Sequence, residues 1–167
     1  MSLTGFNHSI HWNEFQILDQ RPSGAVKDAE VLVFTHINWR TAAQANGDCR
    51  VVNVSASINV DLNKSWVIKG KKGVYLRLHE QGHYDIVAIG LREMYNKISA
   101  LIKTRCEDVN QEALKIQREV QQLIDITRQR YQVQTNDGSN RTMQNNWETQ
   151  INTVKLNSNG ALADLPK

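Results

Sequence analysis

The chain has 167 residues, of which 40% are hydrophobic and 22% charged, and its 20 basic and 17 acidic side chains leave a formal net charge of +3 at pH 7. This length predicts one domain with a single core, and so small and dispersed a charge argues against a nucleic-acid-binding face. No apolar run approaches the roughly 20 residues of a membrane-spanning helix, and two cysteines exclude a disulfide-rich scaffold.

The first part of the chain is predicted to form β-strands. Ranges 9–18 and 30–39 are rich in β-branched and aromatic residues, and a turn is expected between them at 21–24. The clearest strand is 49–62, because its apolar residues alternate with Asn, Ser and Asp, as on a strand with one buried and one wet face. The alternating apolar residues are Val52, Val54, Ala56, Ile58, Val60 and Leu62.

Helices follow from about residue 74. Apolar residues recur at three- and four-residue steps over 74–102, and a short break at 104–108 has helix-capping character. A second helix is predicted over 109–131 and a shorter one over 143–154. The apolar stripe of the second helix, expected to pack on the first helix, is Val109, Ala113, Ile116, Val120, Leu123, Thr127 and Tyr131.

This order predicts a single α+β domain over residues 1–167: an N-terminal antiparallel β-sheet, two long helices and a short C-terminal helix. Residues 1–6 and 157–167 are expected to fray. Residues 1–6 also lack the basic and apolar segments of a signal peptide, which does not by itself make the protein cytosolic.

The first predicted helix carries the one motif with chemical content, H-E-x-x-H at His79, Glu80 and His83. Residues four apart lie on one face of a helix, so both imidazoles can bind one zinc ion, with Zn–N distances of about 2.0–2.1 Å. Glu80 lies beside the first ligand, where it can accept a proton from an attacking water. The alternative is a packed helix whose two histidines are satisfied by hydrogen bonds.

A catalytic zinc needs a third protein ligand. Glu93 lies about 15 Å beyond His83 along the helix axis, and position 89, where an elongated motif would have its third histidine, is Ile. The third ligand must therefore come from a distant segment. The candidates are Asp108, Asp125, Asp137 and His36; His8 and His11 are expected to be structural.

The two cysteines, Cys49 and Cys106, permit one pairing, and their count alone leaves open whether they are reduced or bonded. A bond would close a loop of 57 residues and stabilise the fold by roughly 4 kcal/mol in the chain-entropy model. It would also indicate an oxidising compartment.

The segment Leu76–Ile86, with its Gly-His-Tyr-Asp-Ile ending, resembles the signature of a bacterial domain family of unknown function that is described as predicted secreted zinc-dependent proteases. The resemblance covers most of the chain. Its other matching parts are Thr35–Arg40, Gly47–Val51, Cys106, Tyr131 and Thr135–Gly138.

The resemblance implies a zincin-like fold, a Cys49–Cys106 disulfide and a secreted or periplasmic protein. It also implies a third zinc ligand immediately before Gly138, where the family has His and this chain has Asp137. A carboxylate oxygen binds zinc at about 2.0–2.2 Å, so the exchange is chemically allowed. An Asn-Asp-Gly turn is the alternative role of Asp137.

The resulting hypothesis is a zinc-dependent metallopeptidase acting on a peptide or protein substrate, with His79, His83 and Asp137 on zinc and Glu80 as general base. The alternatives are a non-catalytic domain that has lost proteolysis and a zinc hydrolase of another amide. Asp85 is expected to accept the other ring N–H of a histidine or to fix the helix; the alternative is an ordinary solvated helix carboxylate. Tyr131 is expected in the core rather than at the oxyanion.

Overall fold

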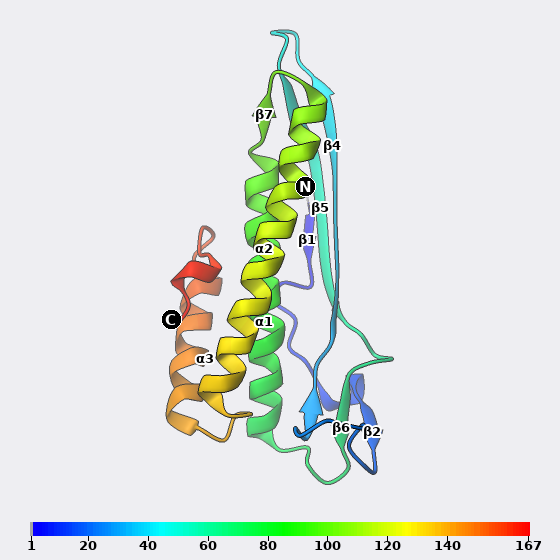
Figure 1. The fold of residues 1–167 in the computed structure, drawn as a ribbon, viewed down its shortest axis with the longest axis vertical. Helices are drawn as coiled ribbons and strands as arrows, with labels where there is room; N and C mark the ends of the chain where they lie inside the picture. The colour runs from blue at the N-terminus through cyan, green and yellow to red at the C-terminus, as the bar shows by residue number, and fades with distance from the viewer. Residues whose placement is uncertain (1) are drawn as a thin grey trace.

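The computed structural model describes residues 2–167, which form three α-helices and two small β-sheets (Figure 1). The fold is α+β, as predicted. The helices are α1 (Val74–Ser99), α2 (Cys106–Thr135) and α3 (Arg141–Leu156). The first sheet contains β1 (Ser2–Thr4), β4 (Val33–Ala43), β5 (Cys49–Val60) and β7 (Ile102–Lys103), and the second contains β2 (Gln16–Leu18), β3 (Ala29–Glu30) and β6 (Trp66–Ile68).

Both sheets are mixed, which corrects the prediction of an N-terminal antiparallel sheet. β4 pairs with β5 antiparallel, but β1 pairs with β5 parallel; in the second sheet β2 is parallel and β3 antiparallel to β6. The predicted strand 9–18 is also mostly wrong. The Glu14 carboxylate accepts the His11 backbone N–H at 2.7 Å and closes a 3-10 turn at Trp12–Glu14, so only Gln16–Leu18 remains extended.

A bulge changes the phase of the long strand β5. Arg40 pairs with Asn53, but the next residue of β4, Thr41, pairs with Val51, so Val52 is left out of the ladder. Val51 is consequently buried and Val52 is 42% exposed. The predicted alternation therefore holds only from Val54 to Val60, and Leu62, beyond the end of β5, is exposed.

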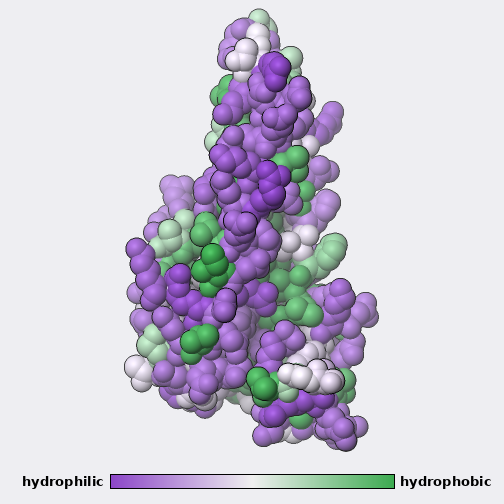
Figure 2. All heavy atoms as spheres, viewed as in Figure 1, coloured by the Kyte–Doolittle hydropathy of each residue, from purple (hydrophilic) through white to green (hydrophobic). Residues whose placement is uncertain are grey.

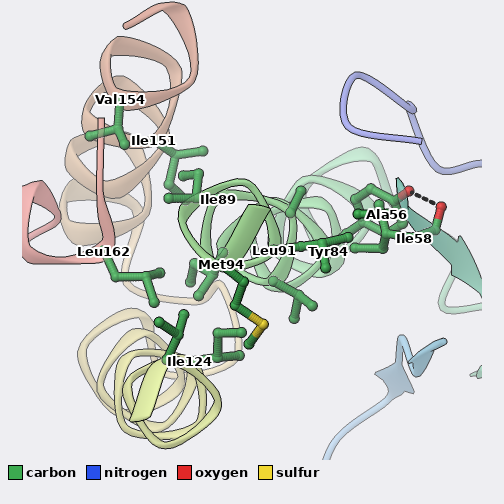
Figure 3. Close-up of a cluster of buried hydrophobic side chains, with 14 of the residues drawn as sticks. Ala56, Ile58, Tyr84, Ile89, Leu91, Met94, Ile124, Ile151, Val154 and Leu162 are labelled. Carbon is green, nitrogen blue, oxygen red and sulfur yellow. Dashed lines mark hydrogen bonds between the residues drawn. The ribbon is translucent and has the colours of Figure 1, made fainter. Parts of the chain in front are cut away.

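Helix α1 is the centre of the core, with β5 on one side and α2 and α3 on the other (Figure 3). The stripe predicted for α2 is buried except at one position: Leu123 is exposed and its neighbour Ile124 packs beside α1. The face of the molecule seen in Figure 2 is mostly hydrophilic, with apolar groups in small patches.

The chain ends, which we expected to fray, are packed. Residues Ser2–Thr4 form β1 against β5, and Met1 lies outside the described residues. After α3 the chain turns back in a 3-10 turn at Leu162–Asp164. Leu162 and Leu165 are each 3% exposed. Their side chains cover apolar surface of the core that would otherwise face water, and this burial holds the C-terminal segment in place.

The disulfide implied by the resemblance is present. Cys49 at the start of β5 is bonded to Cys106 at the start of α2, with their Cα atoms 5.0 Å apart. Across residues 2–167, no helix has both the length and the apolar character that crossing a membrane requires.

Candidate metal centre

The histidine–glutamate motif lies in the first turns of α1, on the side that faces α2 and the start of β4. His79 is 1%, Glu80 3% and His83 7% exposed. The two imidazole rings meet edge to face with their centroids 4.8 Å apart, as the four-residue spacing predicts. The motif is therefore enclosed by the fold and brings both histidines to one place.

Both histidines point at one atom, the side-chain oxygen of Gln132 on α2. Gln132 Oε1 lies 3.2 Å from His79 Nε2 and 2.8 Å from His83 Nε2. The amide nitrogen of Gln132 donates a hydrogen bond to the Asp137 carboxylate. The structure thus assembles His79, His83 and Gln132 at one point, with Asp137 one hydrogen bond farther out.

The second ring nitrogen of His79 faces helix α3. Nδ1 lies 3.2 Å from Gln144 Oε1 and 3.3 Å from Thr135 Oγ1, whose own hydroxyl donates to the Tyr131 carbonyl at 2.7 Å. Both ring nitrogens of His79 therefore face accepting oxygens, but a neutral imidazole carries one N–H. Protonation would supply a second, yet burial lowers the His79 pKa.

A cation beside Nε2 removes this conflict. Nδ1 then donates to Gln144, and Nε2 offers its lone pair, which is the tautomer that metal-binding histidines adopt. The ring of His79 is already fixed, because it stacks on Tyr131 with centroids 4.9 Å apart and planes 14° apart. By the donor chemistry of the two imidazoles, and by the hydrogen bonds of His79, the residues fit a zinc ion.

His83 is also neutral at pH 7. Burial, the proximity of His79 and the charge of Arg128 hold its pKa well below the usual range. Its Nδ1 atom is buried and has no hydrogen-bond partner within residues 2–167. A neutral histidine is the form that binds a metal ion, so both rings are in the binding form without first losing a proton.

Glu80 lies under the chain between β3 and β4. The backbone N–H of Val31 donates to Glu80 Oε2 at 2.6 Å. Burial raises the pKa of Glu80 to about 7, against the smaller opposing effects of the Val31 hydrogen bond and the charge of Lys27. A carboxyl group with a pKa near neutrality can both accept and release a proton at pH 7.

Asp137 is placed by an unusual turn after α2. Asn136, Asp137 and Gly138 all have positive φ angles, of 47°, 53° and 75°. Gly138 lies so close to His79 that an added Cβ atom would be 3.0 Å from the His79 Cβ. The turn therefore holds Asp137 beside the histidines, although no three His, Cys, Asp or Glu residues of the described chain are grouped closely enough to hold a metal.

The other candidate ligands are engaged elsewhere. Asp108 pairs with Arg105 at 2.8 Å, Asp125 accepts from Gln121 at 3.0 Å, and His36 is exposed on β4 opposite Ser57. None of the three has a hydrogen bond to His79 or His83 among the contacts of residues 2–167.

Asp85 fixes helix α1, which is one of the roles expected for it, and it is not a solvated carboxylate. Its carboxylate is buried and accepts from Lys155 Nζ on α3 at 2.7 Å and from Gln81 at 3.1 Å, so it ties α1 to α3 instead of orienting a histidine. Tyr131 is a core residue, as expected, and its hydroxyl donates to the His79 carbonyl at 3.0 Å.

Gln132 is the residue that sequence reasoning missed. It has no motif around it, and glutamine is common along the polar faces of α2. Its one signal is position: it follows Tyr131, the last residue of the predicted apolar stripe, and precedes the Asn-Asp-Gly turn by four residues.

Fold and site together define an α+β protein with a buried His-Glu-x-x-His centre between two long helices. A family model described as "Bacterial protein of unknown function (DUF922)" matches residues 14–139, most of the chain, so the protein belongs to this family. The matched range spans the whole site, from Val31 through α1 to the turn at Asp137 and Gly138. No curated protein and no solved structure matches the chain.

Proposed function

We propose that the protein is a zincin-like, zinc-dependent metallopeptidase that cleaves peptide bonds at the centre formed by His79, His83 and Glu80. The observation that carries the proposal is the convergence of the two Nε2 atoms on one point, at 3.2 and 2.8 Å from the same oxygen. We infer that the third donor comes from the Gln132–Asp137 pair, because Gln132 Oε1 lies at that point and Asp137 accepts from the Gln132 amide nitrogen.

Zinc bound there would supply a Lewis acid that polarises the scissile carbonyl and acidifies a water. The protein's own residues do the rest. Glu80 accepts the proton of the attacking water and delivers it to the leaving amine. Tyr131 and Gln144 hold His79 in a single orientation throughout, by stacking and by accepting from Nδ1.

The start of β4 suits an extended substrate. β4 is an edge strand, and its outer edge pairs with no other strand within residues 2–167, so a peptide can add to it through backbone hydrogen bonds. Val31, two residues before β4, covers Glu80. Because Glu80 is 3% exposed, the segment around Val31 must move for a substrate to reach the carboxylate.

The protein is proposed to work in the periplasm or outside the cell. The support is the Cys49–Cys106 bond, because disulfides persist in oxidising compartments and are rare in the cytosol.

The test uses two substitutions in the full chain. Wild-type protein is expected to contain about one zinc per chain by elemental analysis and to digest a peptide library, with the products identified by mass spectrometry. Glu80→Gln should keep the zinc and lose turnover by at least about 10²-fold, since it removes the proton acceptor. The matched control is Glu119→Gln, which replaces an exposed glutamate of α2. It should change neither the zinc content nor the turnover.

Absence of zinc from the wild type, with none taken up on titration, would refute the proposal. Loss of zinc from Glu80→Gln would instead make Glu80 a ligand and overturn its role as the base.

A non-catalytic zincin-like binding domain is the second candidate. The burial of Glu80 beneath Val31 favours it, because the structure has the carboxylate closed off. Zinc-loaded wild-type protein that cleaves no peptide in the library, and matches Glu80→Gln in every digest, would select this candidate over the peptidase.

A further inference from the structure

We propose that Gln132 is itself the third metal ligand, through Oε1, and that Asp137 acts through Gln132 instead of binding the metal. The inference rests on the proposed zinc function and deepens it. It assigns the site as His79, His83 and Gln132, with Asp137 as a positioning residue.

The carboxamide oxygen of Gln132 lies at a ligand-to-ligand distance from both histidines. Two donor atoms of a tetrahedral zinc site with bonds of about 2.0–2.1 Å lie roughly 3.3 Å apart. Gln132 Oε1 lies 3.2 Å from His79 Nε2 and 2.8 Å from His83 Nε2, so its distance to each histidine is close to that between two ligands of one ion. Asp137 makes no hydrogen bond to either histidine within residues 2–167, and its contact is with the Gln132 nitrogen.

The Gln132 carboxamide is also oriented with its oxygen toward the histidines. A glutamine side chain can present either its oxygen or its nitrogen, and only the oxygen can bind a cation. The Asp137 carboxylate accepts from Gln132 Nε2 and so fixes the oxygen toward the histidines. This is the arrangement in which a carboxylate behind a ligand sets that ligand's orientation and basicity.

The residues around Gln132 support its side chain rigidly. Gln132 follows Tyr131, whose ring stacks on His79 and whose hydroxyl is bonded to the His79 carbonyl. The left-handed turn at Asn136–Gly138 then brings Asp137 back to Gln132. Both ends of the Gln132 carboxamide are therefore held by residues that are themselves fixed against α1.

A neutral third ligand changes the electrostatics of the site. Two imidazoles and an amide leave the full charge of a divalent ion uncompensated by direct ligands, whereas a bound carboxylate would neutralise half of it. We expect weaker zinc binding than in a site with a carboxylate ligand, and Asp137 supplies its negative charge from one hydrogen bond away.

The test measures metal affinity, which does not depend on turnover. Metal-free full-length protein is titrated with Zn²⁺ against a chelating dye and with Co²⁺ by visible absorption, whose intensity and position report the ligand set. Gln132→Leu removes the donor and should weaken Zn²⁺ binding by more than about 100-fold. Asp137→Asn should weaken it by about 10–100-fold, as for a residue behind a ligand.

Two further variants complete the set. Gln132→Glu keeps an oxygen in place and should bind Zn²⁺ at least as tightly as wild type, with a shifted Co²⁺ spectrum. Gln129→Leu, an exposed glutamine one turn earlier on α2, is the matched control and should bind as wild type does. Circular dichroism of each metal-free variant separates lost folding from lost binding, and Gln132→Asn, which withdraws the oxygen by one methylene, replaces any variant that fails to fold.

The outcomes separate the two proposals. Wild-type affinity and an unchanged Co²⁺ spectrum in Gln132→Leu, with binding lost in Asp137→Asn, would overturn the inference and make Asp137 the direct ligand. The proposed zinc function would survive that result. A wild-type chain that binds neither ion would refute both.

Discussion

Glu80 is a carboxyl group held inside the protein with one backbone N–H donating to it. Val31 provides that donor at 2.6 Å, and burial still raises the pKa to about 7. A single neutral hydrogen bond does not replace the hydration that a carboxylate loses on burial. Burial of this carboxyl group therefore costs the folded protein stability once the group is ionised.

The first prediction follows from that pKa in metal-free protein. The folded pKa of Glu80, about 7, lies above the ordinary value of 4.5, so the folded state holds the proton more tightly. The stabilisation of the folded state that comes from protonated Glu80 is fully present below pH 4.5 and is lost as the pH rises through 7. Relative to wild type, Glu80→Gln should therefore gain about 3 kcal/mol in unfolding free energy between pH 4.5 and pH 8.

Urea unfolding in the presence of a chelator, at several pH values, measures this difference. His79 and His83, with lowered pKa values, give wild type and variant alike an opposite slope, which cancels in the difference. Lys27, Glu30 and Arg128 face Glu80 in both proteins. Parallel stability curves for the two proteins would show that Glu80 titrates as an ordinary glutamate.

At the scale of elements, the contact between α1 and α2 depends on a glycine inside the motif. A Cβ atom on Gly82 would lie 2.2 Å from Tyr131 Oη and 2.5 Å from Cζ. Tyr131 cannot easily withdraw, because it stacks on His79 and packs edge-on against Trp147. The glycine lets α2 approach α1 closely enough for Gln132 to reach the two histidines.

The second prediction is that Gly82→Ala destabilises the protein, although helix propensity alone predicts that it stabilises. Gly82→Ala in an isolated helix would stabilise it by about 1 kcal/mol, but the clash with Tyr131 should make the protein less stable by about 1–3 kcal/mol. Urea midpoints of Gly82→Ala, alone and combined with Tyr131→Leu, measure the coupling. A loss of stability that is equal in both backgrounds would show that Tyr131 is not the cause.

The sequence predicted those parts of the fold that local spacing determines. Helix α1 was expected over 74–102 and spans Val74–Ser99, and the histidine pair is close because four residues make about one helical turn. The phase of β5 was missed at Val52 because a bulge depends on the partner strand, which no alternation within β5 encodes.

The part of the site that the sequence did not reveal is the part made by distant residues. His79 and Gln132 are 53 residues apart, and their meeting depends on how α2 packs on α1. Asp137 was one of four candidate third ligands, and only the resemblance singled it out; its hydrogen bond to Gln132 follows from three consecutive left-handed residues. Asn-Asp-Gly signals a tight turn, but it does not say what that turn faces.

At the scale of the whole molecule, the proposed metal centre and the disulfide lie at opposite ends of the helix pair. α1, α2, β4 and β5 run along the long axis (Figure 1). His79 is in the second turn of α1, whereas Cys106 begins α2 just after α1 ends. At 1.5 Å per residue, about 30 Å of helix separates His79 from that end.

The last prediction uses this separation. Replacing both cysteines by alanine opens a loop of 57 residues and should lower the unfolding free energy by about 4 kcal/mol, the loop-closure entropy restored to the unfolded chain. The zinc affinity should stay within about twofold of wild type. The residues that hold His79 are Tyr131, Thr135 and Gln144, which lie at the end of the helix pair far from the disulfide. Chemical denaturation and dye-competition titration, run on the same samples below the shifted midpoint, measure the two quantities. Weakened zinc binding in the still-folded variant would mean that the crosslink sets the position of α2 along its whole length, and the stability and binding functions of the fold would then be coupled.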